Sequence, residues 1–338
     1  MSLFIRKRQF AAQACELLRA DWWWSRIDPS LGLVTLNYHR IGDRTESSID
    51  TGVYSATAEA FEAQIRYLKM HCDLIGLTDL PDVLRTGSSR RAVLLTFDDG
   101  YLDNYEIAFP ILRRHQVPAV IFLATGFIDQ PKVAWWDEIS WMVRQTSERV
   151  LALSDRWKVR PVQISRDTSN AVLDRLLHLV KALSPQELAQ LIEELAERLQ
   201  TGRAPITAQT APWMNWDMIR EMRQGGIEFG GHTISHPVLA YCTPEQQRAE
   251  IFGCKARIEQ ELGEPIQAFT YPVGMRNSFN PQTMDLVREA GYRWAFGFYS
   301  GFTAPSCNPY DLRRVAVSPD IAESEFRMMV RLPRLFAR

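Results

Sequence analysis

The sequence lacks the features that mark several common classes of protein. Its 338 residues carry a net charge of −1, so no overall positive field favours a nucleic-acid partner. No apolar run approaches the roughly 20 residues that a membrane-spanning helix needs. Polar and charged residues from Arg6 to Gln9 interrupt the apolar stretch that a secretory signal requires. We therefore expect a protein that is neither exported nor integral to a membrane, and that has no nucleic-acid partner.

Cysteine is scarce, and a glycine-rich phosphate loop is absent. The five cysteines are scattered and form no C-x-x-C pair, a pattern typical of reduced thiols in a protein that faces the cytosol. The expected location is therefore cytoplasmic. The lack of a glycine-rich loop after any predicted strand disfavours a nucleotide-binding fold.

What the sequence does contain is a regular alternation of strands and helices. Hydrophobic residues make up 46% of the chain, which is enough for a sizeable core. Apolar periodicity predicts strands at residues 33–38, 93–97, 117–123, 227–231, 268–271 and 294–298, and helices at 57–70, 105–115, 243–262 and 281–290. The alternation favours an α/β fold with a parallel sheet or barrel, in which the polar clusters that follow the strands share one face.

The chain divides into three predicted parts. Residues 1–30 are predicted to form a basic and aromatic helical segment, residues 31–320 the barrel, and residues 321–338 a basic tail. A helical insertion is predicted within the barrel at about residues 127–212, where leucines recur at helical spacing. Inside it, the string that starts at Ser184 is a capping box with proline at the first helical position.

Two adjacent carboxylates, Asp98 and Asp99, follow the strand predicted at residues 93–97. Gly100 allows a sharp turn through which both can reach one cleft. Two carboxylates this close resist ionising together unless a cation lies nearby. A metal held by one of them lowers the pKa of a water, and the other can accept the proton of that water. An Asp-Asp-Gly string taken alone is more often a turn in which one Asp caps the next helix.

Two histidines, His232 and His236, follow the strand predicted at residues 227–231. A helical spacing of four places both imidazoles on one face, as in other His-x-x-x-His zinc sites. The alternative for this motif alone is two ordinary histidines, one of them in the core. Because both motifs follow strands, we favour a shared site. Together they supply one more carboxylate than a His-His-Asp metal site needs.

The two strings resemble the first two signatures of the polysaccharide deacetylases of carbohydrate esterase family four. The resemblance runs from about residue 33 to residue 317 and is interrupted by the insertion. It implies a distorted (β/α) barrel of the polysaccharide deacetylase type. It also implies that Asp98 is the general base and that Asp99, His232 and His236 bind a divalent metal, expected to be zinc.

The family's third signature matches the stretch from Phe269 to Gly274. The resemblance implies that the backbone N–H of Val273 is an oxyanion donor, a role that does not depend on the side chain. Thr270 stands where the family carries an arginine that pairs with the base. Arg276 and Arg314 are the candidates to replace that arginine, and the sequence does not decide between them.

The family's late histidine, its general acid, is missing, because no histidine follows His236. His39 instead ends the first predicted strand. Its Tyr-His string resembles the branch that acts on exopolysaccharides such as poly-N-acetylglucosamine, in which an early histidine supplies the acid. The first and last strands of a barrel are neighbours, so one position in space can be filled from either end of the chain. We predict His39 as the acid, with a structural core histidine as the alternative.

Several further residues are candidates for substrate contact. Aromatic residues crowd the insertion and its edge, where sugar rings could stack on indole faces, although core packing is the favoured interpretation. These aromatic residues are Trp135, Trp136, Trp141, Trp213 and Trp216. The residues that we expect to bind substrate are Tyr101, Tyr271, Pro272 and Arg314.

We predict a metal-dependent hydrolase that removes N-acetyl groups from hexosamine residues of a polysaccharide or lipid-linked glycan. One alternative is a deformylase or another amidase that acts on a lipid-linked aminosugar. A second is a glycan-binding member of the family that has lost turnover because Thr270 replaces the arginine.

The two ends of the chain raise a separate hypothesis about location. Each places basic residues beside apolar ones, at residues 4–18 and 327–336, a composition that suits an anionic membrane surface. The hypothesis is peripheral contact at the inner face of the membrane through these basic termini. The favoured alternative is that both ends are amphipathic helices that pack on the barrel.

Overall fold

The computed structural model describes residues 32–47, 49–88, 90–299, 301–304 and 307–333. The predicted N-terminal segment, residues 1–30, and the last part of the predicted tail, residues 334–338, lie outside the described residues. Within the described ranges, no helix is both long enough and apolar enough to cross a membrane.

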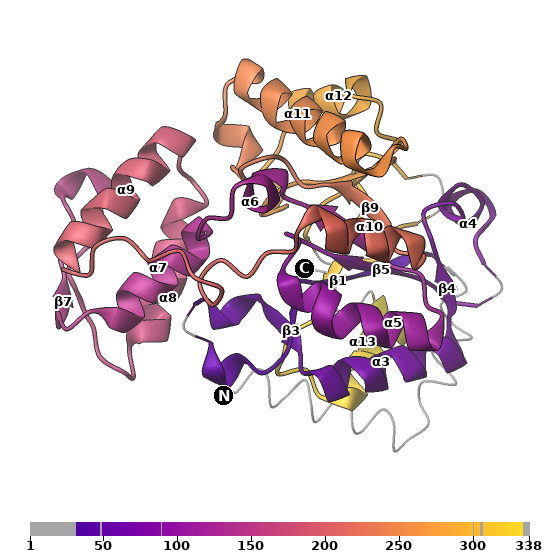
Figure 1. The fold of residues 1–338 in the computed structure, drawn as a ribbon, viewed down its shortest axis with the longest axis horizontal. Coiled ribbons are helices and arrows are strands. Elements are labelled where there is room, and N and C mark those ends of the chain that lie inside the picture. Colours follow the sequence, from indigo (N-terminus) through magenta and orange to yellow (C-terminus); the bar gives the residue numbers. More distant parts are fainter. Residues whose placement is uncertain (1–31, 48, 89, 300, 305–306, 334–338) are drawn as a thin grey trace.

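A parallel sheet organises the described chain (Figure 1). Its strands are β1 (Val34–Tyr38), β4 (Asp73–Ile75), β5 (Ala92–Phe97), β6 (Val120–Leu123), β9 (Glu228–Gly231), β10 (Ala268–Thr270), β11 (Trp294–Phe296) and β12 (Val315–Ala316). They run in the order β11-β10-β9-β6-β5-β1-β12, and β4 pairs with the first half of β5. The sheet curls into a half-barrel, which confirms the predicted α/β class. The first and last strands are direct neighbours, with Leu36 opposite Val315.

Helices cover the sheet and bury its apolar side chains. They are α3 (Ala58–His71), α4 (Leu80–Thr86), α5 (Phe109–His115), α6 (Thr125–Asp129), α10 (Trp216–Gln224), α11 (Pro244–Leu262), α12 (Pro281–Glu289) and α13 (Glu323–Arg331). Helix α11, predicted at residues 243–262, begins with a capping box, in which Thr243 and Gln246 each satisfy a backbone N–H of the other. Short 3-10 turns span Arg44–Glu46, Thr51–Val53, Asp155–Trp157 and Leu239–Tyr241, and a π-helical turn spans Asn104–Ala108.

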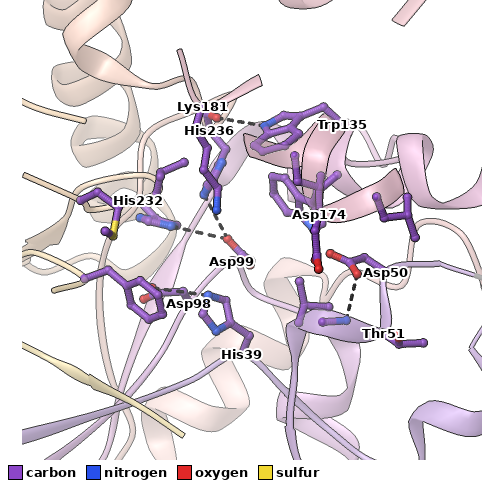
Figure 2. Close-up of a pocket in the computed structure, with 18 of the residues that line it drawn as sticks. His39, Asp50, Thr51, Asp98, Asp99, Trp135, Asp174, Lys181, His232 and His236 are labelled. Atoms are coloured by element: carbon purple, nitrogen blue, oxygen red, sulfur yellow. Dashed lines mark hydrogen bonds and ion pairs between the residues drawn. The ribbon is translucent and has the colours of Figure 1, made fainter. Parts of the chain in front are cut away.

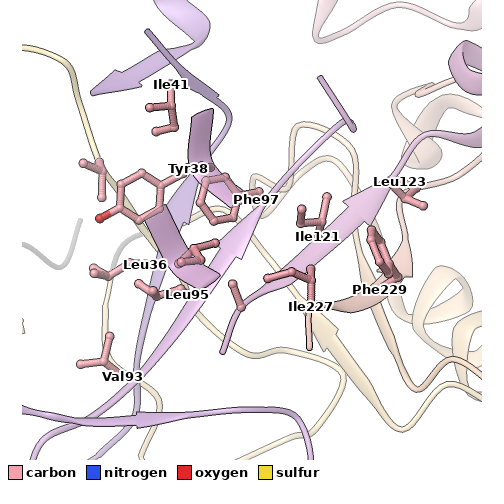
Figure 3. Close-up of a cluster of buried hydrophobic side chains, with 14 of the residues drawn as sticks. Leu36, Tyr38, Ile41, Val93, Leu95, Phe97, Ile121, Leu123, Ile227 and Phe229 are labelled. Carbon is pink, nitrogen blue, oxygen red and sulfur yellow. The ribbon is translucent and has the colours of Figure 1, made fainter. Parts of the chain in front are cut away.

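The alternation of side chains along β5 explains how the sheet presents polar groups at its edge. Val93, Leu95 and Phe97 lie in the main core between the sheet and its helices, as Figure 3 shows. Leu94 lies in a second buried cluster on the opposite face. Successive residues of a strand point to opposite faces, so the next residue on the Leu94 side after Thr96 is Asp98. The strand therefore delivers Asp98 to the inner face of the curl.

The region predicted as an insertion has a hydrophobic cluster of its own. It contains α7 (Trp135–Gln145), α8 (Ser169–Val180), α9 (Pro185–Arg198) and the small hairpin of β7 (Val150–Leu151) and β8 (Val162–Gln163). Its buried residues run from Ile139 to Leu199 and form a cluster separate from the main core. The capping box predicted at Ser184 and Glu187 is present at the start of α9. Figure 1 shows these helices grouped to one side of the sheet.

The C-terminal helix α13 packs on the barrel. Phe326, Met329 and Val330 are buried in the main core, and Arg327 pairs with Glu323 one turn away. This placement follows the predicted alternative in which an amphipathic end packs on the barrel. The membrane hypothesis for the N-terminal segment concerns residues outside the described ranges.

A buried carboxyl group ties the insertion to the barrel. Asp137 on α7 is fully buried and accepts hydrogen bonds from the Tyr101 hydroxyl, at 2.9 Å, and from the Asp50 backbone N–H, at 3.0 Å. Burial, and then the charge of Asp50, raise the pKa of Asp137 to about 7, although the cation of Arg40 opposes the rise. The folded protein therefore holds a proton here that the unfolded chain releases above pH ~4.

This proton predicts a specific pH dependence of stability. Between pH ~4 and ~7 the folded state binds more protons at Asp137 than the unfolded state, so its contribution falls as pH rises, by about 1.4 kcal/mol per pH unit. Asp137→Asn removes this titrating group. As pH rises from ~4 to ~7, the unfolding free energy of the variant should therefore increase relative to that of the wild type by about 1.4 kcal/mol per pH unit. Urea unfolding at several pH values measures it. The exposed Asp167→Asn on the same insertion is the control, and a pH-independent difference for Asp137→Asn contradicts the prediction.

Candidate metal centre and active site

The two adjacent aspartates at the end of β5 have different partners. Asp98 receives a two-pronged ion pair from Arg314, with Nη1 to Oδ1 at 2.7 Å and Nη2 to Oδ2 at 2.8 Å. Arg314 is almost completely buried, and its Nη1 also donates to the Asn37 side-chain oxygen at 2.9 Å. Asn37 in turn donates to Asp98 Oδ2 at 3.3 Å. Of the two arginines that the sequence left open, Arg314 is therefore the one that pairs with Asp98. Arg276 lies over the Tyr299 ring instead.

The ion pair keeps Asp98 charged despite its burial. Burial alone raises the pKa of this carboxyl, but the Arg314 guanidinium, helped by its hydrogen bonds, outweighs burial and holds the pKa well below its ordinary range. Asp98 is therefore an ionised acceptor at neutral pH.

Asp99 has no such partner. Its Oδ1 is buried without a hydrogen bond, 3.5 Å from His232 Nε2 and 3.6 Å from His236 Nε2. One ligand atom from each of the three residues lies within 4.8 Å of the others. In the absence of a cation, burial and the neighbouring Asp98 charge raise the pKa of Asp99 well above its ordinary value. An unpaired buried carboxylate beside two imidazoles is a donor set that fits a divalent metal.

The two histidines come together through a loop and not through a helix. The expectation of helical spacing was wrong, because residues 232–238 after β9 have no helical structure. Thr233 and His236 adopt left-handed backbone angles, with φ of 69° and 58°, and these bends return His236 toward Asp99. The Glu250 carboxylate on α11 accepts the backbone N–H groups of Ile234 and Ser235, at 2.7 and 2.8 Å, and so fixes the loop.

The two imidazoles are held in different ways. His232 Nδ1 lies 2.9 Å from the Thr270 carbonyl oxygen and 2.5 Å from its hydroxyl oxygen. With Nδ1–H as the donor, Nε2 presents its lone pair toward Asp99. His236 Nδ1 is buried without a hydrogen-bond partner among the described residues, and the ring packs edge-on against Trp136, 4.6 Å between centroids. Burial lowers the pKa of both histidines, which favours the neutral form that binds metal.

His39 lies beside Asp98 on the wall of the same cavity. Its Nε2 is 3.9 Å from Asp98 Oδ2, and its side chain is 25% exposed. The backbone on either side is anchored, because the His39 N–H donates to the Ser55 hydroxyl and its carbonyl accepts the Asn104 amide. Burial lowers the pKa of His39 to about 4, and the Asp98 charge opposes that shift. The ring is therefore neutral at pH 7 and within reach of whatever occupies the site.

The cavity over these residues has a volume of about 500 Å³ (Figure 2). Asp98, Asp99, His232, His236, His39, Val273, Tyr271 and Arg314 all line it. Val273 adopts a left-handed φ of 61°, so the chain bends sharply at the residue predicted to donate its N–H. Among the described residues outside glycine, seven have positive φ, and four of these are Asp99, Thr233, His236 and Val273. Such strain gathers where a fold fixes functional groups.

Two residues expected to contact substrate do not line this cavity. Tyr101 is fully buried, with its ring stacked on Trp213 and its hydroxyl bonded to Asp137, so it is a structural residue that supports the site from behind. Pro272 is buried in the turn and sets up the bend at Val273. Tyr271 and Arg314 do reach the cavity, but Tyr271 donates to the Tyr310 carbonyl and Arg314 is committed to Asp98.

Sequence reasoning missed several residues that shape the cavity. Asn37, which directly precedes the Tyr-His string, bonds both Asp98 and Arg314. Its position on the same face of the sheet as Asp98 follows from the β1–β5 register, in which Asn37 lies opposite Thr96. Trp135 and Trp136 do line the cavity, while Trp213 packs internally against Phe127 and Tyr101. Residues of α8 also line the cavity, and no pattern in the sequence indicated this.

Comparisons with known proteins agree with this geometry. The sequence model of the polysaccharide deacetylase family matches residues 85–151 and 167–295. The poly-β-1,6-N-acetyl-D-glucosamine N-deacetylase of Staphylococcus aureus is 31% identical over 214 residues, 58% of this chain and 70% of that protein. The Bacillus subtilis protein YxkH, provisionally named a polysaccharide deacetylase, is 23% identical over 238 residues, 70% of this chain. The chain spans only 56% of the length of that protein.

A solved structure shows the same fold. The Streptococcus pyogenes deacetylase PplD, in complex with acetate, superposes with a TM-score of 0.59 at 17% identity, over 88% of this chain and 97% of that one. At this identity the likeness concerns the fold alone.

The contact between Thr270 and His232 predicts an effect on metal affinity. Thr270→Val removes the hydroxyl and keeps the carbonyl, so His232 loses one of the two groups that orient it, and zinc affinity should fall about tenfold. Thr270→Ser keeps the hydroxyl and should restore the affinity. Competition with a chromophoric chelator measures it directly. Equal affinities for the valine and serine variants would show that the hydroxyl does not position the ligand.

Proposed function

This chain belongs to the polysaccharide deacetylase family, and on that premise we propose that it hydrolyses N-acetyl groups from hexosamine residues of a polysaccharide or lipid-linked glycan. The observation that carries the proposal is that the two neighbouring carboxylates have different partners. Asp98 is ionised by Arg314, and Asp99 faces two neutral imidazoles. The substrate class is supported by the Staphylococcus aureus relative, which is named a poly-β-1,6-N-acetyl-D-glucosamine N-deacetylase.

Zinc is the metal that we propose for Asp99, His232 and His236. Two imidazole nitrogens and one carboxylate oxygen form a three-ligand set typical of catalytic zinc, which leaves further positions open. When bound, the cation polarises the amide carbonyl and increases the acidity of a water.

The residues of the chain then divide the remaining steps. Asp98 accepts a proton from the attacking water, whose oxygen forms the new bond to the acetyl carbon. The proposed role of the Val273 N–H is to donate to the carbonyl oxygen as negative charge develops there, and its position on the cavity wall supports this. The carbon–nitrogen bond breaks as the nitrogen gains a proton, which releases acetate and a free amine on the sugar.

His39 is the group that we propose for proton delivery to the leaving nitrogen. Its ring is neutral before the reaction, so it must first gain the proton that it gives. Asp98, 3.9 Å away, holds the proton taken from water and is its nearest source. The Arg314 ion pair favours the ionised form of Asp98, and so favours passage of this proton to the neutral His39 ring when the two side chains come within hydrogen-bond distance. In this proposal the same proton passes from the water to Asp98, then to His39, and finally to the leaving nitrogen.

The alternatives predict different products or none. A deformylase or another amidase on the same residues would release formate or a different acid. A glycan-binding protein without turnover was suggested by the loss of the arginine at position 270. Arg314 supplies the charge partner that Thr270 does not, and this favours an active enzyme.

Acetate release tests the proposal. We expect the protein to liberate acetate from β-1,6- and β-1,4-linked N-acetylglucosamine oligomers, and a chelator should abolish the activity until zinc is restored.

Asp98→Asn should retain the metal and lose about 10²–10⁴-fold in kcat, because a general base is removed. An enzyme-coupled acetate assay together with elemental analysis measures both. Formate as the product supports the deformylase, and near-normal turnover in Asp98→Asn rejects the role of Asp98.

A second prediction separates His39 from the base. His39→Ala should keep the metal content and lose about 10²-fold or more in kcat for an amide. The loss should be much smaller for an acetate ester with a good leaving group such as 4-nitrophenolate, which departs without protonation. The kcat ratio of amide to ester is the measurement. Equal losses on both substrates would assign His39 a role other than the acid.

A further inference from the structure

We propose that helix α8 of the insertion and the turn at residues 50–53 form a sugar-binding subsite across the cavity from the metal centre, which selects substrates longer than one sugar. The inference deepens the proposed function and rests on it. The metal centre occupies only one wall of a cavity of about 500 Å³, a volume in the range of sites that bind drug-sized ligands. The opposite wall has no part in the chemistry.

One stripe of α8 forms much of that opposite wall. The residues that line the cavity are Asn170, Leu173, Asp174, Leu177 and Lys181, the last at the C-terminal cap. Their spacing of three and four residues places them on a single face of the helix. Figure 2 shows Asp174 beside Asp50 and Thr51, on the far side of the cavity from His39 and Asp98. The helix therefore presents a continuous surface to any ligand held at the metal.

Arg144 holds this wall together. Its guanidinium donates to the Thr51 hydroxyl at 3.2 Å and to the Asn170 side-chain oxygen at 3.3 Å, and its Nε donates to Ser140 at 3.2 Å. It thereby links α7, α8 and the turn that precedes β3 (Tyr54–Ala56), which pairs with β2 (Arg40–Ile41). Asp50 is anchored separately through the Gly52 N–H at 2.8 Å. A wall built in this way is preorganised, and binding a ligand to it costs little ordering.

The chemistry of the wall fits a neutral polyhydroxyl ligand. Leu177 and the indole of Trp135, both only partly buried, offer apolar area for the carbon face of a sugar ring, and the buried Leu173 supports them from the insertion core. Asn170, Asp174 and Lys181 provide both donors and acceptors for hydroxyl groups. Asp174 and Lys181 are exposed on the cavity lining and form no ion pair among the described residues, so both can bond a ligand.

Charge on this wall is balanced, which argues against other occupants. Two carboxylates, Asp50 and Asp174, face two cations, Arg144 and Lys181. An anionic group such as a phosphate would meet the carboxylates, and a long hydrocarbon chain would leave the polar groups unpaired at a cost of about 1–3 kcal/mol each. A neighbouring hexosamine of the same glycan satisfies both the apolar and the polar groups. The subsite therefore favours a polymeric or oligomeric glycan.

Binding and turnover on matched glycan lengths test the subsite. The substrates are N-acetylglucosamine and its trisaccharide, and the variants are Asp174→Ala and the double variant Asn170→Ala/Asp174→Ala. We expect the wild type to prefer the trisaccharide, and the double variant to reduce that preference in kcat/KM about tenfold, mainly through KM. Arg175→Ala, an exposed residue on the other side of α8, is the matched control and should keep the wild-type preference. Thermal unfolding confirms that each variant is folded.

A second measurement keeps the inference independent of turnover. Calorimetric binding of the two sugars to the metal-loaded Asp98→Asn protein, with and without the α8 substitutions, reports the subsite even if no acetate is released. Loss of the length preference in the α8 variants supports the inference. An affinity that is the same for both lengths, or unchanged by the double variant, overturns it. If the Asp98→Asn protein binds the trisaccharide more tightly but the wild type releases no acetate, the proposed function is contradicted and the subsite stands.

Discussion

The site depends on one electrostatic constraint, because two adjacent buried carboxylates cannot both be charged unless each has its own cation. Arg314 neutralises Asp98 through two short hydrogen bonds and is itself held by Asn37 and by the Gly297 carbonyl. Asp99 has no cationic side chain in contact with it among the described residues: its nearest partners are two neutral imidazoles, and the Arg314 charge acts on it only from beyond Asp98. The chain thus ionises one carboxylate permanently and leaves the other to a metal. This asymmetry supports the proposed roles of Asp98 as base and Asp99 as ligand, although the two stand next to each other in the sequence.

Backbone strain is the means by which the loops deliver these groups. A strand would send Asp98 and Asp99 to opposite faces, and the left-handed φ of 76° at Asp99 turns the second carboxylate toward the first. Thr233, His236 and Val273 bend their loops in the same way. Each such residue costs about 1–3 kcal/mol, so the fold must stabilise the conformation from outside. Glu250 does this for the histidine loop by accepting two backbone N–H groups, and the buried β9 and β10 strands fix the points from which the loops depart.

Local patterns in the sequence were sufficient for the elements and the motifs, but not for the long-range partners. Apolar periodicity located six of the eight strands of the main sheet to within a few residues and missed the short strands β4 and β12. The Ser184 and Thr243 caps could be recognised because capping is a contact between residues three apart. The pairing of Asp98 with Arg314 joins positions 216 residues apart and follows only from the neighbouring positions of β1, β5 and β12. The histidine loop was wrongly predicted as a helix, because two histidines four residues apart can also be brought together by a loop with positive φ angles, here at Thr233 and His236. Tyr101 was misplaced because burial behind the site, and not sequence proximity to Asp99, decides what it contacts.

The insertion packs against the candidate metal site, because residues of its first helix contact the His236 ring and line the cavity. Trp136 packs on the His236 ring, and its indole N–H donates to Tyr101, which bonds Asp137 on the same helix. His236 Nδ1 has no hydrogen-bond partner among the described residues, so the packing of Trp136, together with that of Trp135 and His232, limits the rotation of its ring. The two hydrophobic clusters fold around separate centres, yet the cavity lies between them and takes residues from both. A displacement of α7 would therefore change the packing on His236 and the far wall of the cavity together, so under the proposed function substrate recognition on the insertion and chemistry on the barrel would be coupled.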